Sequence, residues 1–144
     1  MIESTLNIKD NLNISTDRNT INICDLLKLY KQTYWAKDRN EEFILKTIDN
    51  SLCFSLLYKD NLIGFTRVVT DYCDFAYLAD VIIHENYRDN KFGTFLIENV
   101  VNELRLKGIR RICLLTRDAQ DFYKRFGFNN THTPLNYMEI ININ

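Results

Sequence analysis

A strand, a loop and a helix that follow one another in the middle of the chain constrain the fold most. The apolar run "FAYLADVII" (residues 75–83) reads as a strand, and apolar residues then recur at helical spacing from residue 92 to residue 104. Gly108 suits the end of that helix, and the run "IRRICLLT" (residues 109–116) predicts another strand. Two strands joined through a helix pair in parallel, so the segment predicts a crossover unit within a sheet.

The rest of the sequence supplies antiparallel strands and further helices. A hairpin is predicted from "LCFSLLY" and "LIGFTRVV", joined by a turn at residues 59–61. The other expected elements are an edge strand around Leu12 and Ile14, helices at 21–33, 41–49 (capped by Asn40) and 119–126 (capped by Asp118, closed by Gly127), and a last strand at 136–143. We therefore expect an α/β fold, with a mixed, mainly antiparallel sheet and helices on both faces.

Length and charge narrow the class of protein. A chain of 144 residues predicts a single domain over residues 1–144, with its core at about 20–140. The net charge of −1 argues against a nucleic-acid binder that works by bulk electrostatics. The N-terminus has no signal-peptide pattern, and no apolar run reaches the roughly 20 residues that span a bilayer. The expected location is cytoplasmic, without nucleic-acid or membrane partners.

The four cysteines are scattered through the chain. Cys24, Cys53, Cys73 and Cys113 show no CxxC spacing, and the two histidines lack cysteine neighbours. A zinc site is therefore not expected, and no other metal is predicted. Mainly apolar neighbours favour buried free thiols, as in a reducing compartment.

The loop between the third strand and the long helix is the first candidate site. In "HENYRDNKFGTFL" (residues 84–96) the first N–H groups of the helix lack intrahelical partners, and the helix dipole favours an anion there. Gly93 lets the backbone approach a ligand, while Arg88 and Lys91 add positive charge. The loop alone fits an anion site and an ordinary polar turn about equally well.

Two segments resemble the GCN5-related N-acetyltransferase (GNAT) family. "VIIHENYRDNKFGTFLIENVV" resembles its acyl-CoA-binding motif, with Arg88, Lys91 and Gly93 at the three defined positions. "DAQDFYKRFGF" resembles its late helix. The residues that match there are Ala119, Tyr123, Gly127 and Phe128. The resemblance extends over residues 35–138, and two motifs in the family's order are more specific than either alone.

The resemblance implies acetyl-CoA as a co-substrate. The expected cofactor-binding residues are the backbone of Ile82 and Ile83, the loop residues Arg88, Asp89, Asn90, Lys91, Phe92, Gly93 and Thr94, and Ala119. Lys91 departs from the family, because it stands where the first glycine is usual. A lysine Cβ should crowd the backbone there. Either the loop bends slightly and turns the Lys91 side chain outward, or its ammonium group reaches a phosphate of CoA. Asp89 is expected to point to solvent.

The resemblance also implies catalytic roles. Tyr123 is expected to protonate the departing thiolate, although its helical spacing would also suit a core aromatic. Asp80, flanked by apolar residues, is either a base or ammonium anchor, or a structural carboxylate paired with Arg67 or Arg117. Asp71 is a lesser candidate base, and a water chain is another route for the proton.

The acceptor is expected near the N-terminal helices. Its predicted contacts are Trp35, Arg67 and Asp71. Trp35, next to Tyr34, either stacks against the acceptor or packs as core, and packing is slightly favoured. The sequence thus predicts an N-acetyltransferase that acts on a primary amine of a small molecule or peptide, as a monomer or homodimer. The alternatives are a non-catalytic acyl-CoA sensor and, more weakly, another nucleotide-phosphate binder.

Overall fold

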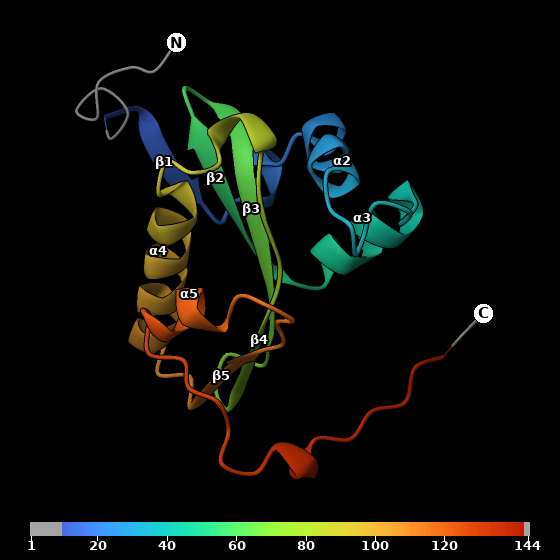
Figure 1. Cartoon of the computed structure of the whole chain (residues 1–144). Helices are drawn as coiled ribbons and strands as arrows, with labels where there is room; N and C mark the ends of the chain where they lie inside the picture. Colours follow the sequence, from blue (N-terminus) through green and yellow to red (C-terminus); the bar gives the residue numbers. More distant parts are fainter. Residues whose placement is uncertain (1–9, 143–144) are drawn as a thin grey trace. The chain divides into compact units, whose positions relative to one another are not determined.

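The chain folds into two compact units, one that ends at Leu114 and one that begins at Leu115. The computed structural model describes residues 10–142. The first unit contains a five-stranded sheet with helices around it (Figure 1). Its elements are β1 (Leu12–Ser15), η1 (Arg18–Thr20), α2 (Ile23–Lys31), α3 (Glu41–Asp49), β2 (Leu52–Tyr58), β3 (Asn61–Thr70), β4 (Phe75–Ile83), η2 (Glu85–Tyr87), α4 (Phe92–Leu106) and β5 (Arg111–Leu114).

The sheet is mixed and mainly antiparallel, as predicted. Its strand order is β1-β2-β3-β4-β5. The first four strands pair antiparallel, and among the described strands only β4 and β5 pair in parallel. Lys59 and Asp60 both have positive φ angles, the conformation that lets two residues close the tight β2–β3 hairpin. The long connection through α4 explains the single parallel pair, because a crossover is needed to return the chain in the same direction.

Helices cover both faces of this sheet. Figure 1 shows α4 against one face, and α2 and α3 on the opposite side. Each of these helices buries one apolar stripe, such as Leu96, Val100 and Leu104 of α4. Asn22 and Asn40 start α2 and α3, since each side chain accepts a hydrogen bond from a backbone N–H group in the first turn. The predicted cap at Asn40 is confirmed.

The second unit contains the short helix α5 (Gln120–Lys124) and the turn η3 (Pro134–Asn136). Gly127 closes the α5 segment with a φ of +100°, as predicted. The predicted cap at Asp118 is wrong. Ala119 occupies the N-cap without a side-chain hydrogen bond, and its N–H group donates to Oγ1 of Thr116 at 3.1 Å.

The predicted last strand is also wrong for its described residues. Residues 137–142 form no strand, and the side chains of Met138 and Ile140 are almost fully exposed. Residues 143–144 lie outside the described part of the chain. Alternating apolar residues indicate strand propensity, but a strand forms only where a neighbour accepts its hydrogen bonds. No strand of the described residues pairs with this segment.

Burial of the cysteines was only partly predicted. All four thiols are free, but only Cys53 is buried; Cys24 and Cys73 are exposed. Cys24 lies in the first turn of α2 and Cys73 in the β3–β4 turn, so an apolar sequence neighbour does not guarantee burial. Among the described residues, no helix is both long and apolar enough to cross a bilayer. No cluster of three or more potential metal-ligating side chains occurs in that part either.

Candidate functional site

The loop between β4 and α4 is braced by its own polar groups. Nε of Arg88 donates a hydrogen bond to the carbonyl of Ile83 at 3.1 Å, so the guanidinium folds back onto the end of β4. Nδ2 of Asn90 donates to the carbonyl of Arg88 at 2.9 Å. The ring of Tyr87 packs against that of Phe92, the first residue of α4. These contacts fix the backbone path that leads into the helix.

Lys91 and Asp89 adopt the left-handed conformation that glycine favours. Their φ angles are +63° and +65°, and Lys91 is the N-cap of α4. This gives a conformational reason for a glycine at the Lys91 position, because a Cβ makes that region costly by about 1–2 kcal/mol. Both side chains are exposed, so the expectation that Asp89 faces solvent is confirmed.

The N-terminus of α4 offers backbone donors. The first intrahelical bond runs from the N–H of Phe95 to the carbonyl of Lys91, and no side chain caps the helix. Within residues 10–142, no hydrogen bond is recorded for the N–H groups of Phe92, Gly93 or Thr94. Three free donors at the positive end of a 15-residue helix can bind an anion.

β4 has an open edge just before this loop. β5 pairs with β4 only from Phe75 to Leu78, so residues 79–83 of β4 have β3 as a neighbour but not β5. The β3–β4 register is also interrupted there. Thr66 stands opposite both Asp80 and Val81, which defines a β-bulge. Oγ1 of Thr66 donates to the carbonyl of Ala79 at 2.8 Å and holds the strand at the start of the bulge.

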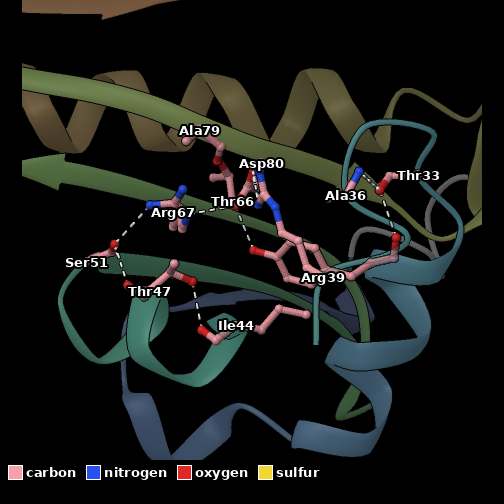
Figure 2. Close-up of polar contacts among 11 residues, drawn as sticks. Thr33, Ala36, Arg39, Ile44, Thr47, Ser51, Thr66, Arg67, Ala79 and Asp80 are labelled. Atoms are coloured by element: carbon pink, nitrogen blue, oxygen red, sulfur yellow. Dashed lines mark hydrogen bonds and ion pairs between the residues drawn. The ribbon is translucent and has the colours of Figure 1, made fainter. Parts of the chain in front are cut away.

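Asp80 lies at the bulge with a φ of +54° and its side chain in a dense polar network (Figure 2). Nε of Arg67 donates to its Oδ2 at 2.6 Å, and the Tyr30 hydroxyl donates to the same oxygen at 2.8 Å. Nη1 of Arg39 reaches both carboxylate oxygens, at 3.2 and 3.1 Å. Two cations and a phenol therefore surround one carboxylate, whose side chain is only 5% exposed. We call Tyr30, Arg39, Arg67 and Asp80 the Asp80 network.

The Asp80 network keeps the carboxylate ionised. Burial acts to raise the pKa of Asp80, but the hydrogen bond and charge of Arg67, and the charge of Arg39, outweigh it and leave the pKa below its ordinary value. Burial and the neighbouring Asp80 charge raise the pKa of the Tyr30 hydroxyl. Nη1 of Arg67 also reaches Ser51 at 3.4 Å, which connects the network to the end of α3 (Figure 2).

The sequence had suggested Arg67 as a partner of Asp80, and this ion pair is present. The sequence did not predict the contacts of Asp80 with Tyr30 and Arg39. Tyr30 fitted the apolar face of a helix, and Arg39 lies in the loop after α2. An aspartate within an apolar strand signals that partners exist. It does not say which of the chain's arginines they are, since residues 39 and 80 meet only through the fold.

The other predicted acceptor contacts have different surroundings. The alternative in which Trp35 packs as core is wrong, because its side chain is 45% exposed and stands edge-on to the exposed Tyr34. Asp71 caps the turn after β3, where its Oδ1 accepts hydrogen bonds from the N–H groups of Cys73, Asp74 and Phe75. These bonds, led by that of Cys73, lower the pKa of Asp71. Whether either residue contacts an acceptor stays a prediction.

Tyr123 and Ala119 belong to the second unit. Tyr123 lies on α5 between the rings of Phe122 and Phe128, with centroid distances of 5.0 and 5.9 Å. Burial raises the pKa of Tyr123 to about 12, so its hydroxyl is protonated at neutral pH. Ala119 is the N-cap of α5. Their roles toward a cofactor stay predictions.

Comparison with known proteins gives concordant matches. Residues 20–128 match the sequence model of the Acetyltransferase (GNAT) family. The N-acetyltransferase ycf52 of Gracilaria tenuistipitata var. liui is 35% identical over 115 residues, which is 75% of this chain and 62% of that protein. The chain thus spans less than two thirds of the length of this relative.

Solved structures show the same architecture. A GNAT-family protein from Xanthomonas campestris pv. campestris superposes with a TM-score of 0.84 at 34% identity, over 91% of this chain and 93% of that one. A GNAT family acetyltransferase from Elizabethkingia anophelis, solved with acetyl-CoA bound, has a TM-score of 0.68 at 18% identity, over 94% and 90% of the two chains. The second match shows the fold alone, and this fold binds acetyl-CoA in that protein.

Proposed function

The chain belongs to the GNAT family of acetyltransferases, and from this premise we propose that it transfers an acetyl group from acetyl-CoA to a primary amine. The observation that carries the proposal is the row of N–H groups at Phe92, Gly93 and Thr94, which have no hydrogen-bond partner within residues 10–142 and follow the open edge of β4 after one short loop. A helix start with free donors suits a phosphate, and an open strand edge suits an extended, amide-containing arm. CoA carries both groups.

The pyrophosphate of CoA is proposed to bind at the α4 N-terminus. Its negative charge is favoured by the helix dipole and by the exposed cations of Arg88 and Lys91. Arg88 is partly committed to the carbonyl of Ile83, so its main contribution is to hold the loop. Backbone N–H groups of the loop, rather than any one side chain, are proposed to donate most of the hydrogen bonds to the pyrophosphate.

The pantetheine arm and the acetyl group are proposed to lie along residues 79–83 of β4, where β5 no longer pairs. The acceptor nitrogen attacks the thioester carbonyl carbon and forms the C–N bond, which leaves a negative charge on the carbonyl oxygen. The C–S bond then breaks, and CoA leaves as the thiolate. Backbone N–H groups of β4 around Ile82 are proposed to stabilise that oxyanion, which is the usual role of fixed backbone donors in acyl transfer.

The departing sulfur is proposed to receive a hydrogen bond from Tyr123. The support is the resemblance of its segment to the late helix of the family, together with a protonated hydroxyl. With its pKa near 12, against about 8.5 for an ordinary thiol, full proton transfer from the phenol to the thiolate is uphill. The phenol therefore stabilises the leaving thiolate as a hydrogen-bond donor more than as a proton source.

Asp80 is proposed as an ionised anchor of the bulge. A general base must have a lone pair available to the substrate proton and a pKa near the working pH. Three donors already occupy the Asp80 carboxylate, and its pKa is lowered. These facts favour the structural alternative. The acceptor amine is then proposed to lose its proton to water.

Two measurements test the proposed function. Acetyl-CoA at a hundred times its dissociation constant should stabilise the protein by about 2.7 kcal/mol in a thermal melt. A panel of amines, amino acids and peptides should yield acceptor-dependent release of free thiol from acetyl-CoA. Binding without turnover across the panel would indicate the acyl-CoA sensor instead. Failure of acetyl-CoA and CoA to stabilise the protein, in a melt where ATP does so, would refute the proposal.

A further inference from the structure

Arg39 has hydrogen-bonding capacity that the protein itself does not use. Its recorded hydrogen bonds all run from Nη1 to Asp80, and within residues 10–142 no partner is recorded for Nε or Nη2. The side chain is 27% exposed, against 15% for Arg67, which is also bonded to Ser51. Of the two arginines in the Asp80 network, Arg39 is therefore the more accessible to a ligand from solvent.

The Asp80 network carries one uncompensated positive charge. Arg39 and Arg67 bring two cations, and Asp80 brings one anion that already accepts bonds from both and from Tyr30. Arg18 and Asp49, whose charges act together with Arg67 and Asp80 on the thiol of Cys53, form an ion pair with each other at 3.0 Å and so add no net charge. A single negative charge next to Arg39 would balance the network. A dianionic phosphate would exceed that balance.

The Arg39 guanidinium is held in place before any ligand arrives. Its central carbon lies 6.0 Å from the ring centroid of Tyr30 and 5.5 Å from that of Phe43, and Asp80 fixes one of its nitrogens. An arginine that has already lost its rotamer freedom costs less entropy when it binds a ligand. Its remaining N–H groups form the planar fork that matches the two oxygens of a carboxylate.

The location fits the acceptor. Asp80 stands in the part of β4 that β5 leaves open, and Arg39 contacts Asp80 directly. Arg39 follows the exposed rings of Tyr34 and Trp35 in the same connection between α2 and α3. This surface offers a cation and apolar rings beside the strand edge proposed for the acetyl group.

We propose that Arg39 binds a carboxylate of the acceptor, so that the preferred acceptors are amines that carry a carboxylate a few bonds away, as free amino acids do. The inference rests on the proposed function, because it assigns a substrate class to that same site. Tyr34 and Trp35 then face the remainder of the acceptor, where apolar side chains are favoured.

The test compares acceptors that differ only in the carboxylate. Leucine is paired with leucinamide, and phenylalanine with phenylalaninamide, and thiol release from acetyl-CoA gives kcat and KM for each. The amides have the lower amine pKa and so supply more free amine at pH 7.5. Each kcat/KM is therefore expressed per concentration of free amine before the acid and the amide are compared, so that a preference for the acids reports binding. A charge-assisted, forked contact predicts a kcat/KM that is about 10- to 100-fold higher for the acids, mainly through KM.

Variants assign the preference to Arg39. Arg39→Met should reduce the acid-to-amide ratio of kcat/KM to about one, and Arg39→Lys, which keeps the charge beside Asp80 but lacks the fork, should reduce it several-fold. Lys46→Met removes the same charge from an exposed position on α3 and should keep the ratio. Tyr30→Phe disturbs Asp80 without removing the fork and should also keep it.

The outcomes separate this inference from the proposed function. Amides that react as well as acids, or an acid preference that survives Arg39→Met, would overturn the role of Arg39 while acetyl transfer stands. If CoA binds but no amine reacts, acetyl transfer itself fails. Calorimetry of N-acetyl-leucine and N-acetyl-leucinamide on the CoA-saturated protein then decides the role of Arg39. Tighter binding of the acid in the wild type, but not in Arg39→Met, would support it, and equal binding would overturn it.

Discussion

The two regions that flank the open end of β4 are built on opposite principles. The loop before α4 presents backbone N–H groups, and its side chains serve mainly to hold the path of the chain. The Asp80 network is made of side chains from α2, the loop after it, β3 and β4, and each depends on the others. A backbone site tolerates many side chains provided that the conformation is allowed. A network of buried charges tolerates almost none.

The largest effect is expected from Asp80→Asn. Asparagine accepts the positive φ at this position, so the change removes the charge and leaves two guanidinium groups without their counterion. Loss of one partner of a buried ion pair costs about 3–5 kcal/mol of unfolding free energy. Chemical denaturation measures it, with the exposed Asp121→Asn as a control expected to change stability by less than about 0.5 kcal/mol.

The same variant tests the role of Asp80 in catalysis. As an anchor, Asp80→Asn loses activity together with stability, and a higher pH does not restore it. Recovery of kcat/KM at high pH, with an unchanged melt, would identify Asp80 as the base. Because the pKa of Asp80 is lowered in the fold, its contribution to stability is present above the unfolded pKa of about 3.9 and disappears as the pH falls through the folded value. Stability should therefore fall more on acidification in the wild type than in Asp80→Asn, which keeps only the contribution of other carboxylates such as Asp71.

Gly93→Val probes the backbone site. Valine is compatible with the first turn of a helix, so the fold should persist while the branched side chain obstructs the approach of the pyrophosphate. We expect CoA affinity to fall at least tenfold, as the loss of one or two good charge-assisted hydrogen bonds would produce. Calorimetry with CoA measures it. Asn99→Val, at an exposed position on the same helix, is the control. Equal affinities of the two variants for CoA would contradict pyrophosphate binding by the backbone at Gly93.

Tyr123→Phe removes one hydroxyl that belongs to neither region. In the proposed mechanism the phenol donates a hydrogen bond to the leaving thiolate. A thiolate is a tolerable leaving group unaided, so kcat should fall by about 100-fold or less. Affinity for acetyl-CoA should change little, because the ring remains. With a pKa of about 12, Tyr123 should introduce no break in the wild-type pH–rate profile below pH 10. Full activity in the variant would remove Tyr123 from the mechanism.

The smallest effect is expected from substitutions of Lys91, at the start of α4. Lys91→Gly relieves the left-handed conformation and should stabilise the protein by about 1 kcal/mol relative to Lys91→Ala, which keeps the strain. Both variants lose the ammonium group. If it pairs with a CoA phosphate, both bind CoA more weakly and with less dependence on salt; if it only crowds the loop, Lys91→Gly binds more tightly. Thermal melts and calorimetry at two salt concentrations separate the two effects.

The contrast between the regions also explains what the sequence reveals. The mixed sheet, most of its elements and the loop that leads into α4 were predictable, because period, turn residues and a short motif are local signals. For the Asp80 network, the sequence predicted only that Asp80, in an apolar strand, must have polar partners. It did not identify Tyr30 and Arg39, because they lie far from Asp80 in the sequence. The failed last strand has the same cause. Its alternation is local, whereas a strand requires a neighbour elsewhere in the chain.

The central claim is that backbone N–H groups at the start of α4 bind CoA, and a nuclear magnetic resonance titration of the ¹⁵N-labelled protein tests it most directly. The amide resonances of Phe92, Gly93 and Thr94 should shift saturably as CoA is added, and their protons should move downfield as hydrogen bonds to phosphate form. The amides in the middle of α4, around Val100, should move far less. Saturation of the protein with CoA while those three amides stay unmoved would contradict it.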